Sequence, residues 1–178
     1  MGIICEPKRV KLFCGIILSE EKIKQGFLGT LEKKFGKVDL ISDTAIFNFS
    51  DYYNSEMGHD LKRFWISFEK LISADELAEI KVFTNHIENV FALNNKRVIN
   101  IDPGYVTPAN VVLATTKNYA HRIYLASGIY AEVTIVYKKN GFLKLPWSYP
   151  DYLSKPATAF FLSTRSELLK QLKKDNND

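Results

Sequence analysis

Residues 97–137 read RVINIDPGYVTPANVVLATTKNYAHRIYLASGIYAEVTIVY. Much of this stretch alternates polar and apolar residues, the two-residue period of a half-buried strand. It predicts strands at 97–102, 121–125 and 130–138, while 109–115 fits either a short helix or an extended segment. Because Asn, Asp, Lys, His, Arg and Glu are concentrated here, we expect a sheet that carries a patterned set of polar side chains.

Two turn signatures interrupt this stretch or follow it. Asp102-Pro103-Gly104 is typical of a turn and predicts the end of the first strand. Asp102 would then stand at a strand end, where a carboxylate suits a ligand as well as it suits an Asx turn. Asn140-Gly141 predicts a hairpin that leads into a further strand at 142–145.

The rest of the chain divides into strands and helices. In chain order we expect strand 10–18, helix 19–35, strands 38–41 and 45–49, polar loop 51–60, strand 61–71, helix 74–93 and a last helix that begins near 154. Ser73 and Glu76 form a capping box that begins helix 74–93. Its apolar stripe predicts Leu77, Ile80, Phe83 and Ile87 as core residues.

This order, β-α-β-β-α-β followed by further strands and a helix, predicts an α+β fold. The first six elements match a ferredoxin-like split βαβ core, whose mostly antiparallel sheet the C-terminal strands and the terminal helix extend. Both helices of this core would cover one face of the sheet. The other face is then covered by the extra strands or partly open. We expect a single domain over residues 1–178.

Composition indicates a soluble globular protein. The chain is 46% hydrophobic and 25% charged, and its apolar runs are too short to span a bilayer or to form a signal peptide. Cys5 and Cys14 are too few for a disulfide scaffold or a zinc cluster, and Cys14 is expected to be a buried thiol. These features favour the cytoplasm.

The net charge is mildly positive, which bears on the class of partner. With 24 basic and 20 acidic residues the net charge is +4, and part of this excess lies in the C-terminal tail. A nucleic-acid-binding domain usually shows a denser basic stripe, so nucleic acid is a disfavoured partner. The oligomeric state is left open.

One face of the predicted sheet collects charged and other polar side chains from four strands. They include Arg63, Asn100, Arg122 and Glu132. Basic groups of this kind hold phosphate and acids hold a divalent ion, so the face suits a small anion or a phosphate bound together with a metal ion. The alternative is a solvated sheet face whose charges only pair with one another.

The residues in and around this face supply the candidate site. As acid–base groups we select His121, Asp102 and Glu132, and His121 is the candidate base because a neighbouring arginine favours its neutral form. The candidate ligand-binding residues are Arg122, Lys117, Asn100, Tyr105 and Arg63. No residue is assigned as a metal ligand and no cofactor is named, and the sequence leaves open whether the protein is an enzyme.

Several long strings of this chain resemble an uncharacterised family, the domain of unknown function numbered 4416. They are VKLF at 10–13, FSDYYNSEMG at 49–58, RFWISFEKLI at 63–72, NIDPGYVTPANVVLATTK at 100–117, HRIYLASGIYAEVTIVY at 121–137 and PWSYPDY at 146–152. The resemblance covers nearly the whole chain. It implies a small bacterial or archaeal cytoplasmic protein and assigns no activity.

Two functions therefore remain open. The first is a domain or enzyme that binds a small anionic ligand, such as a nucleotide or another phosphate, on the polar sheet face. The second is a non-catalytic module that binds a protein or RNA through its basic tail and through aromatic residues expected in loops, Tyr105 among them. A deep pocket lined by Asp102, Arg122 and Glu132 would favour the first, and a flat face with exposed aromatics the second.

Overall fold

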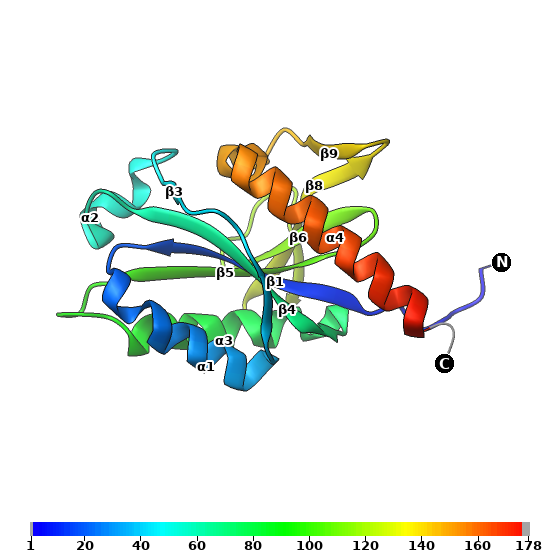
Figure 1. The fold of residues 1–178 in the computed structure, drawn as a ribbon, viewed down its shortest axis with the longest axis horizontal. Coiled ribbons are helices and arrows are strands. Elements are labelled where there is room, and N and C mark those ends of the chain that lie inside the picture. Colours follow the sequence, from blue (N-terminus) through cyan, green and yellow to red (C-terminus); the bar gives the residue numbers. More distant parts are fainter. Residues whose placement is uncertain (1, 176–178) are drawn as a thin grey trace.

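The computed structural model describes residues 2–175, which form an antiparallel sheet of nine strands with helices on both faces (Figure 1). The strands are β1 (Val10–Leu18), β2 (Val38–Ile41), β3 (Ala45–Ile46), β4 (Lys62–Ile72), β5 (Ile99–Val106), β6 (Asn110–Thr115), β7 (Ile123–Ala126), β8 (Ile129–Lys138) and β9 (Gly141–Lys144). The helices are α1 (Lys24–Phe35), α2 (Asn54–Met57), α3 (Leu77–Val90) and α4 (Lys155–Asp175). Short one-turn helices precede them: η1 (Glu21–Ile23), η2 (Asp51–Tyr53), η3 (Ala74–Glu76) and η4 (Pro150–Leu153).

The sheet order is β2-β4-β1-β5-β6-β8-β7, with β3 paired to β4 and β9 paired to β8. The mixed helix and sheet class and the antiparallel pairing predicted from sequence are confirmed. The strands after β5 extend the sheet sideways and do not cover its second face. That face is covered in part by α4, which lies on the side of the sheet opposite α1 and α3 (Figure 1).

The first face of the sheet packs against α1 and α3. Alternate residues of β1 and β5, among them Cys14, Ile99 and Ile101, are buried there with Ile80 and Ile87 of α3. Leu77, Ile80 and Ile87 are buried as the helical stripe predicts, and Phe83 is half-buried against the same cluster. The capping box of Ser73 and Glu76 is present at the start of this helical segment.

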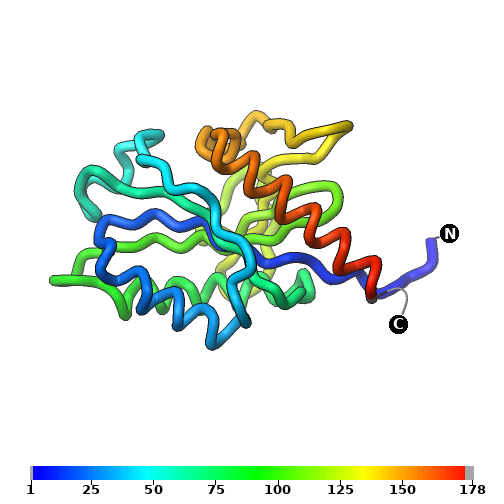
Figure 2. The backbone as a smooth tube through the Cα atoms, in the orientation of Figure 1, coloured from blue at the N-terminus to red at the C-terminus, as the bar shows by residue number. Residues whose placement is uncertain are grey.

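The second face packs against α4 and the segment that leads into it. Phe13 of β1 and Trp65 of β4 lie in one cluster with Tyr152 and Phe161. At the far end of α4 the buried Lys11 ammonium donates to Gln171 Oε1 at 3.0 Å and pairs with Asp39 Oδ2 at 2.6 Å. The C-terminal end of α4 therefore lies beside the start of β1 (Figure 2).

The prediction of a turn at Pro103-Gly104 is wrong, because both residues lie within β5. The N–H of Ile101 points away from β1, and the ring nitrogen of Pro103, two residues on, faces the same side. No strand within residues 2–175 pairs there, because β6 joins β5 only from Gly104 onward, so the proline removes no ladder hydrogen bond. The segment 109–115 is extended and forms β6.

Gly104 allows β6 and the Phe13 side chain of β1 to lie close to the backbone of β5. A Cβ atom at this position would lie 2.3 Å from the Val112 carbonyl oxygen and 2.6 Å from Phe13 Cζ. The contact between β5 and β6 involves the residue pairs Gly104–Leu113, Tyr105–Val112 and Val106–Val111. Beyond them the two strands separate, and the first half of β5 has no strand partner on that side in the described part of the chain.

Candidate functional site

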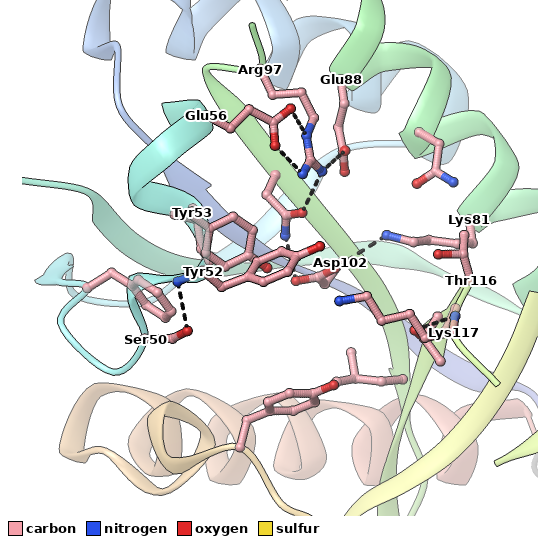
Figure 3. Close-up of a pocket in the computed structure, with 18 of the residues that line it drawn as sticks. Ser50, Tyr52, Tyr53, Glu56, Lys81, Glu88, Arg97, Asp102, Thr116 and Lys117 are labelled. Carbon is pink, nitrogen blue, oxygen red and sulfur yellow. Dashed lines mark hydrogen bonds and ion pairs between the residues drawn. The ribbon is translucent and has the colours of Figure 1, made fainter. Parts of the chain in front are cut away.

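A cavity of about 960 Å³ lies where β5 and β6 separate (Figure 3). Its wall is formed by η2 and α2, by α3, by the first half of β5, by the end of β6 and by η4. The charged groups that line it are Glu56, Arg63, Lys81, Glu88, Arg97, Asp102, Lys117, Glu132 and Asp151. The site therefore brings both signs of charge into one partly enclosed space.

Asp102 is held within this cavity by residues of α3 and β5. Lys81 Nζ lies 3.3 Å from Asp102 Oδ1, and Asn100 Nδ2 donates to Asp102 Oδ2 at 2.7 Å. The same Lys81 ammonium donates to the Ile101 carbonyl oxygen at 2.9 Å, while Ile101 N donates to Glu88 Oε1 at 2.7 Å. Side chains of α3 thus occupy the backbone groups that a neighbouring strand would otherwise bind.

A second ionic cluster connects the η2–α2 segment to α3 through Arg97. Arg97 donates from Nε and Nη2 to the two carboxylate oxygens of Glu56 at 2.7 and 2.6 Å, and from Nη1 to Glu88 at 3.1 Å. The hydrogen bonds from Arg97 hold the pKa of Glu56 below its ordinary value. Burial raises the pKa of Glu88, an effect that the Lys81 charge and the Ile101 N–H oppose.

Tyr52 and Lys117 meet at the mouth of the cavity, where Lys117 points toward the tyrosine ring (Figure 3). Lys117 Nζ lies 4.1 Å from the centre of that ring, and both residues are exposed. Tyr53 lies further inside, and burial, reinforced by the Asp102 charge, raises the pKa of its phenol. The mouth is thus formed by one aromatic ring and one ammonium group.

Arg63 and Asp151 form a buried ion pair in the wall near η4. Arg63 Nη2 lies 2.9 Å from Asp151 Oδ2. The guanidinium carbon lies 4.6 Å from the Trp65 ring centre and 5.5 Å from that of Tyr152. Arg63 Nε and Nη1 have no hydrogen-bond acceptor among residues 2–175, so these aromatic faces compensate part of the buried charge.

Gly15 lies directly beneath this guanidinium. A Cβ atom on Gly15 would lie 2.9 Å from Arg63 Nη2 and 3.1 Å from Nη1. Because Gly15 has no side chain, Arg63 can lie close to the backbone of β1 at this position. This position is fixed by packing, which makes Arg63 part of the cavity wall and of the core together.

Glu132, His121 and Arg122 form a third cluster at the end of the sheet. Glu132 Oε2 lies 2.7 Å from Arg122 Nε and 3.1 Å from His121 Nε2. Arg122 also donates to Tyr149 Oη at 3.0 Å, and the His121 ring stacks on Trp147 at 4.7 Å between centres. Glu132 and Tyr149 line the cavity, whereas His121 and Arg122 do not line it and instead contact Glu132.

The structure therefore brings most of the sequence-selected residues to one cavity. Asp102, Glu132, Lys117, Asn100 and Arg63 line the cavity. The ones it does not bring there are His121, Arg122 and Tyr105. Tyr105 lies within β5, not in a loop, and packs against the apolar clusters on the α1 and α3 face.

Other lining residues were not predicted from the sequence, chiefly Lys81 and Glu88. Both are nearly fully buried although they are charged. The available signal was their place in α3, because Lys81 follows Ile80, Glu88 follows Ile87, and their seven-residue spacing puts them on one helix face. A base and an acid beside an apolar stripe indicate a polar strip that faces the fold.

Neither a metal cluster nor a membrane-spanning helix is found in the part of the chain that the structure describes. Within residues 2–175 no three His, Cys, Asp or Glu side chains are grouped so as to hold a metal ion. None of the described helices has the length and apolar character needed to cross a bilayer.

The chain belongs to the family described as Domain of unknown function (DUF4416), which matches residues 8–168. That range includes all of the cavity-lining residues named above. Comparison with curated proteins gives no match, and comparison with solved structures gives none either.

Proposed function

We propose that the cavity between β5 and β6 binds a small anionic ligand, such as a nucleotide or another phosphate. The observation that carries this proposal is that the Lys117 ammonium is not paired with a carboxylate in the described part of the chain. It is the one lining cation without a carboxylate partner among residues 2–175, whereas Arg63, Lys81 and Arg97 all have ion pairs. Its ammonium is therefore available to an incoming anion.

The shape and lining of the cavity support a small molecule. Its volume of about 960 Å³ lies at the upper end of the range typical of ligand sites. Tyrosine rings, amides and hydroxyls stand beside the charged groups, which is the mixture that orients a polar ligand. These lining groups include Tyr52, Tyr149, Asn85, Asn89, Thr115 and Thr116.

A thermal-shift titration with inorganic phosphate, pyrophosphate and nucleoside phosphates tests this proposal. A ligand at 100 times its dissociation constant stabilises the fold by about 2.7 kcal/mol, which is a readily measured rise in Tm. Lys117→Gln should abolish the shift and leave the melting of the unliganded protein nearly unchanged, because this side chain is exposed. No shift with any of these compounds would contradict the proposal.

The matched control is Lys33→Gln, which removes an exposed lysine from α1, an element that does not line the cavity. Both variants lose one positive charge. If the ligand responds only to the net charge of the protein, the two variants will weaken binding equally. A loss confined to Lys117→Gln assigns the effect to the cavity mouth.

We also propose that the chain is one domain with a ferredoxin-like split βαβ core. The order β2-β4-β1-β5 supports it, since α1 connects two strands that flank β4 and α3 connects two strands that flank β1. The return of α4 to the start of β1 supports the single domain. An experimental structure with β5 paired to β4 would contradict this assignment.

A further inference from the structure

Asp102 keeps hydrogen-bonding capacity that the protein does not use. A carboxylate offers about four lone-pair sites, and the contacts described above take one on each oxygen, from Lys81 and from Asn100. The side chain is 28% exposed and lines the cavity, so its remaining sites face the space where a ligand would lie.

The Asp102 carboxylate is also unsuited to contact a phosphate. Two negative charges repel one another, and the repulsion is stronger in a partly enclosed site than in water. An anion that enters at Lys117 therefore leaves Asp102 unoccupied, unless the same ligand carries neutral hydrogen-bond donors. Figure 3 shows Asp102 beside Lys81 and Tyr53, and Lys117 at the ring of Tyr52.

Hydroxyl groups match the polar lining of the cavity that contains Asp102. Asn85, Asn89 and Thr115 line the same cavity, and amide and hydroxyl side chains both donate and accept. A ligand hydroxyl also does both, so it can donate to the carboxylate while it accepts from an amide. Carboxylates hold the neighbouring hydroxyls of ribose in this way in other proteins.

We infer that the ligand of this cavity is a phosphate ester with neighbouring hydroxyl groups, which Lys117 holds by the phosphate and Asp102 by the hydroxyls. The inference rests on the proposed function, because it assigns a second recognition group to the same site. It specifies a sugar phosphate, whether free or as part of a nucleotide, and it makes inorganic phosphate a poor ligand.

Calorimetric titration of the unmodified protein tests the inference with ribose 5-phosphate, 2-deoxyribose 5-phosphate and inorganic phosphate. Ribose 5-phosphate should bind about tenfold tighter or more than each of the other two, as expected for hydrogen bonds to a charged acceptor. Equal affinity of the ribose and deoxyribose compounds would overturn the inference. Binding of none of the three would instead count against the proposed function.

Asp102→Asn provides the second measurement. It keeps the shape of the side chain and removes its charge, so the preference for ribose 5-phosphate over its deoxy analogue should fall to about twofold or less, while phosphate still binds. An undiminished preference in this variant would overturn the role of Asp102. Adenosine 5′-monophosphate distinguishes the two sources: tighter binding than ribose 5-phosphate indicates a nucleotide, and equal or weaker binding indicates a free sugar phosphate.

Discussion

Arg63 Nη2 lies 2.9 Å from Asp151 Oδ2, and the side chains of the two residues are only 3% and 7% exposed. Asp151 belongs to η4, whereas Arg63 lies near the start of β4. The ion pair therefore fastens the segment that precedes α4 to the strand it covers. Burial raises the pKa of Asp151, and the Arg63 charge opposes that rise.

Removal of one member of this pair should be costly. Asp151→Ala leaves the Arg63 guanidinium buried without a carboxylate, and we expect a loss of about 3–5 kcal/mol in the free energy of unfolding. Urea denaturation measures it. The double variant Arg63→Met/Asp151→Ala should be more stable than the single variant, because it buries no unpaired charge. A double variant less stable than Asp151→Ala would contradict this account.

Arg122→Ala is expected to destabilise the fold. Glu132 is 2% exposed, and its carboxylate would lose the donor that lies at 2.7 Å. We expect a loss of about 3–5 kcal/mol, measured by urea denaturation. The comparison is Arg122→Ala/Glu132→Gln, which should recover part of the loss. Unchanged stability of Arg122→Ala would show that water or His121 compensates Glu132.

Gly104→Ala should disturb the contact between β5 and β6. The added methyl group would lie 2.3 Å from the Val112 carbonyl oxygen, so we expect a loss of about 1–3 kcal/mol or more. Gly29→Ala is the control, because within residues 2–175 no atom other than the adjoining helix backbone lies within 4 Å of a Cβ at that helical position. It should stabilise the protein by about 0.5–1 kcal/mol. Equal effects in thermal melts would contradict the close approach at Gly104.

Ile80→Ala tests the packing of α3 on the sheet. Ile80 is 5% exposed, and deletion of such a side chain costs about 2–5 kcal/mol. Val82, two residues further along the same helix, is 47% exposed, so Val82→Ala should change stability by about 0.5 kcal/mol or less. A loss for Ile80→Ala that is no larger than this would mean that the other helix face is buried.

Acid should loosen the η2–α2 segment through Glu56. The pKa of Glu56 is lowered in the folded protein by the hydrogen bonds from Arg97. A lowered folded-state pKa contributes stability that is present above the ordinary value of 4.5 and is lost as the pH falls through the folded value. Glu56→Gln should remove this part of the pH dependence below 4.5, as measured by urea denaturation. An unchanged acid profile would contradict it.

Local patterns were sufficient to predict most of the elements of this fold. The alternation of Leu12, Cys14 and Ile16 and the capping box at Ser73 act within a few residues, so the sequence displays them directly. The error at Pro103-Gly104 arose because the same dipeptide suits a turn and an unpaired strand edge. Only the register of β5 against its neighbours decides between them, and that register is set by tertiary packing.

The candidate site was predictable in part for the same reason. Asn100 and Asp102 share a strand face, so their alternation was enough to place them together. Lys81 and Glu88 could not be found in this way, because their partners lie on β5 and a helix pattern does not reveal which strand it meets. Tyr105 was misplaced because the predicted turn put it in a loop.

The contacts of Lys81 and Glu88 with Ile101 also bear on how the protein avoids aggregation. An unpaired strand edge is a template for intermolecular strand addition, and a ligand cavity bounded by such an edge must stay open to solvent. Here the carbonyl and the amide of Ile101 are already occupied by helix side chains at 2.9 and 2.7 Å. A foreign strand would have to displace both before it could pair, so the open edge is protected while the space beside it remains accessible.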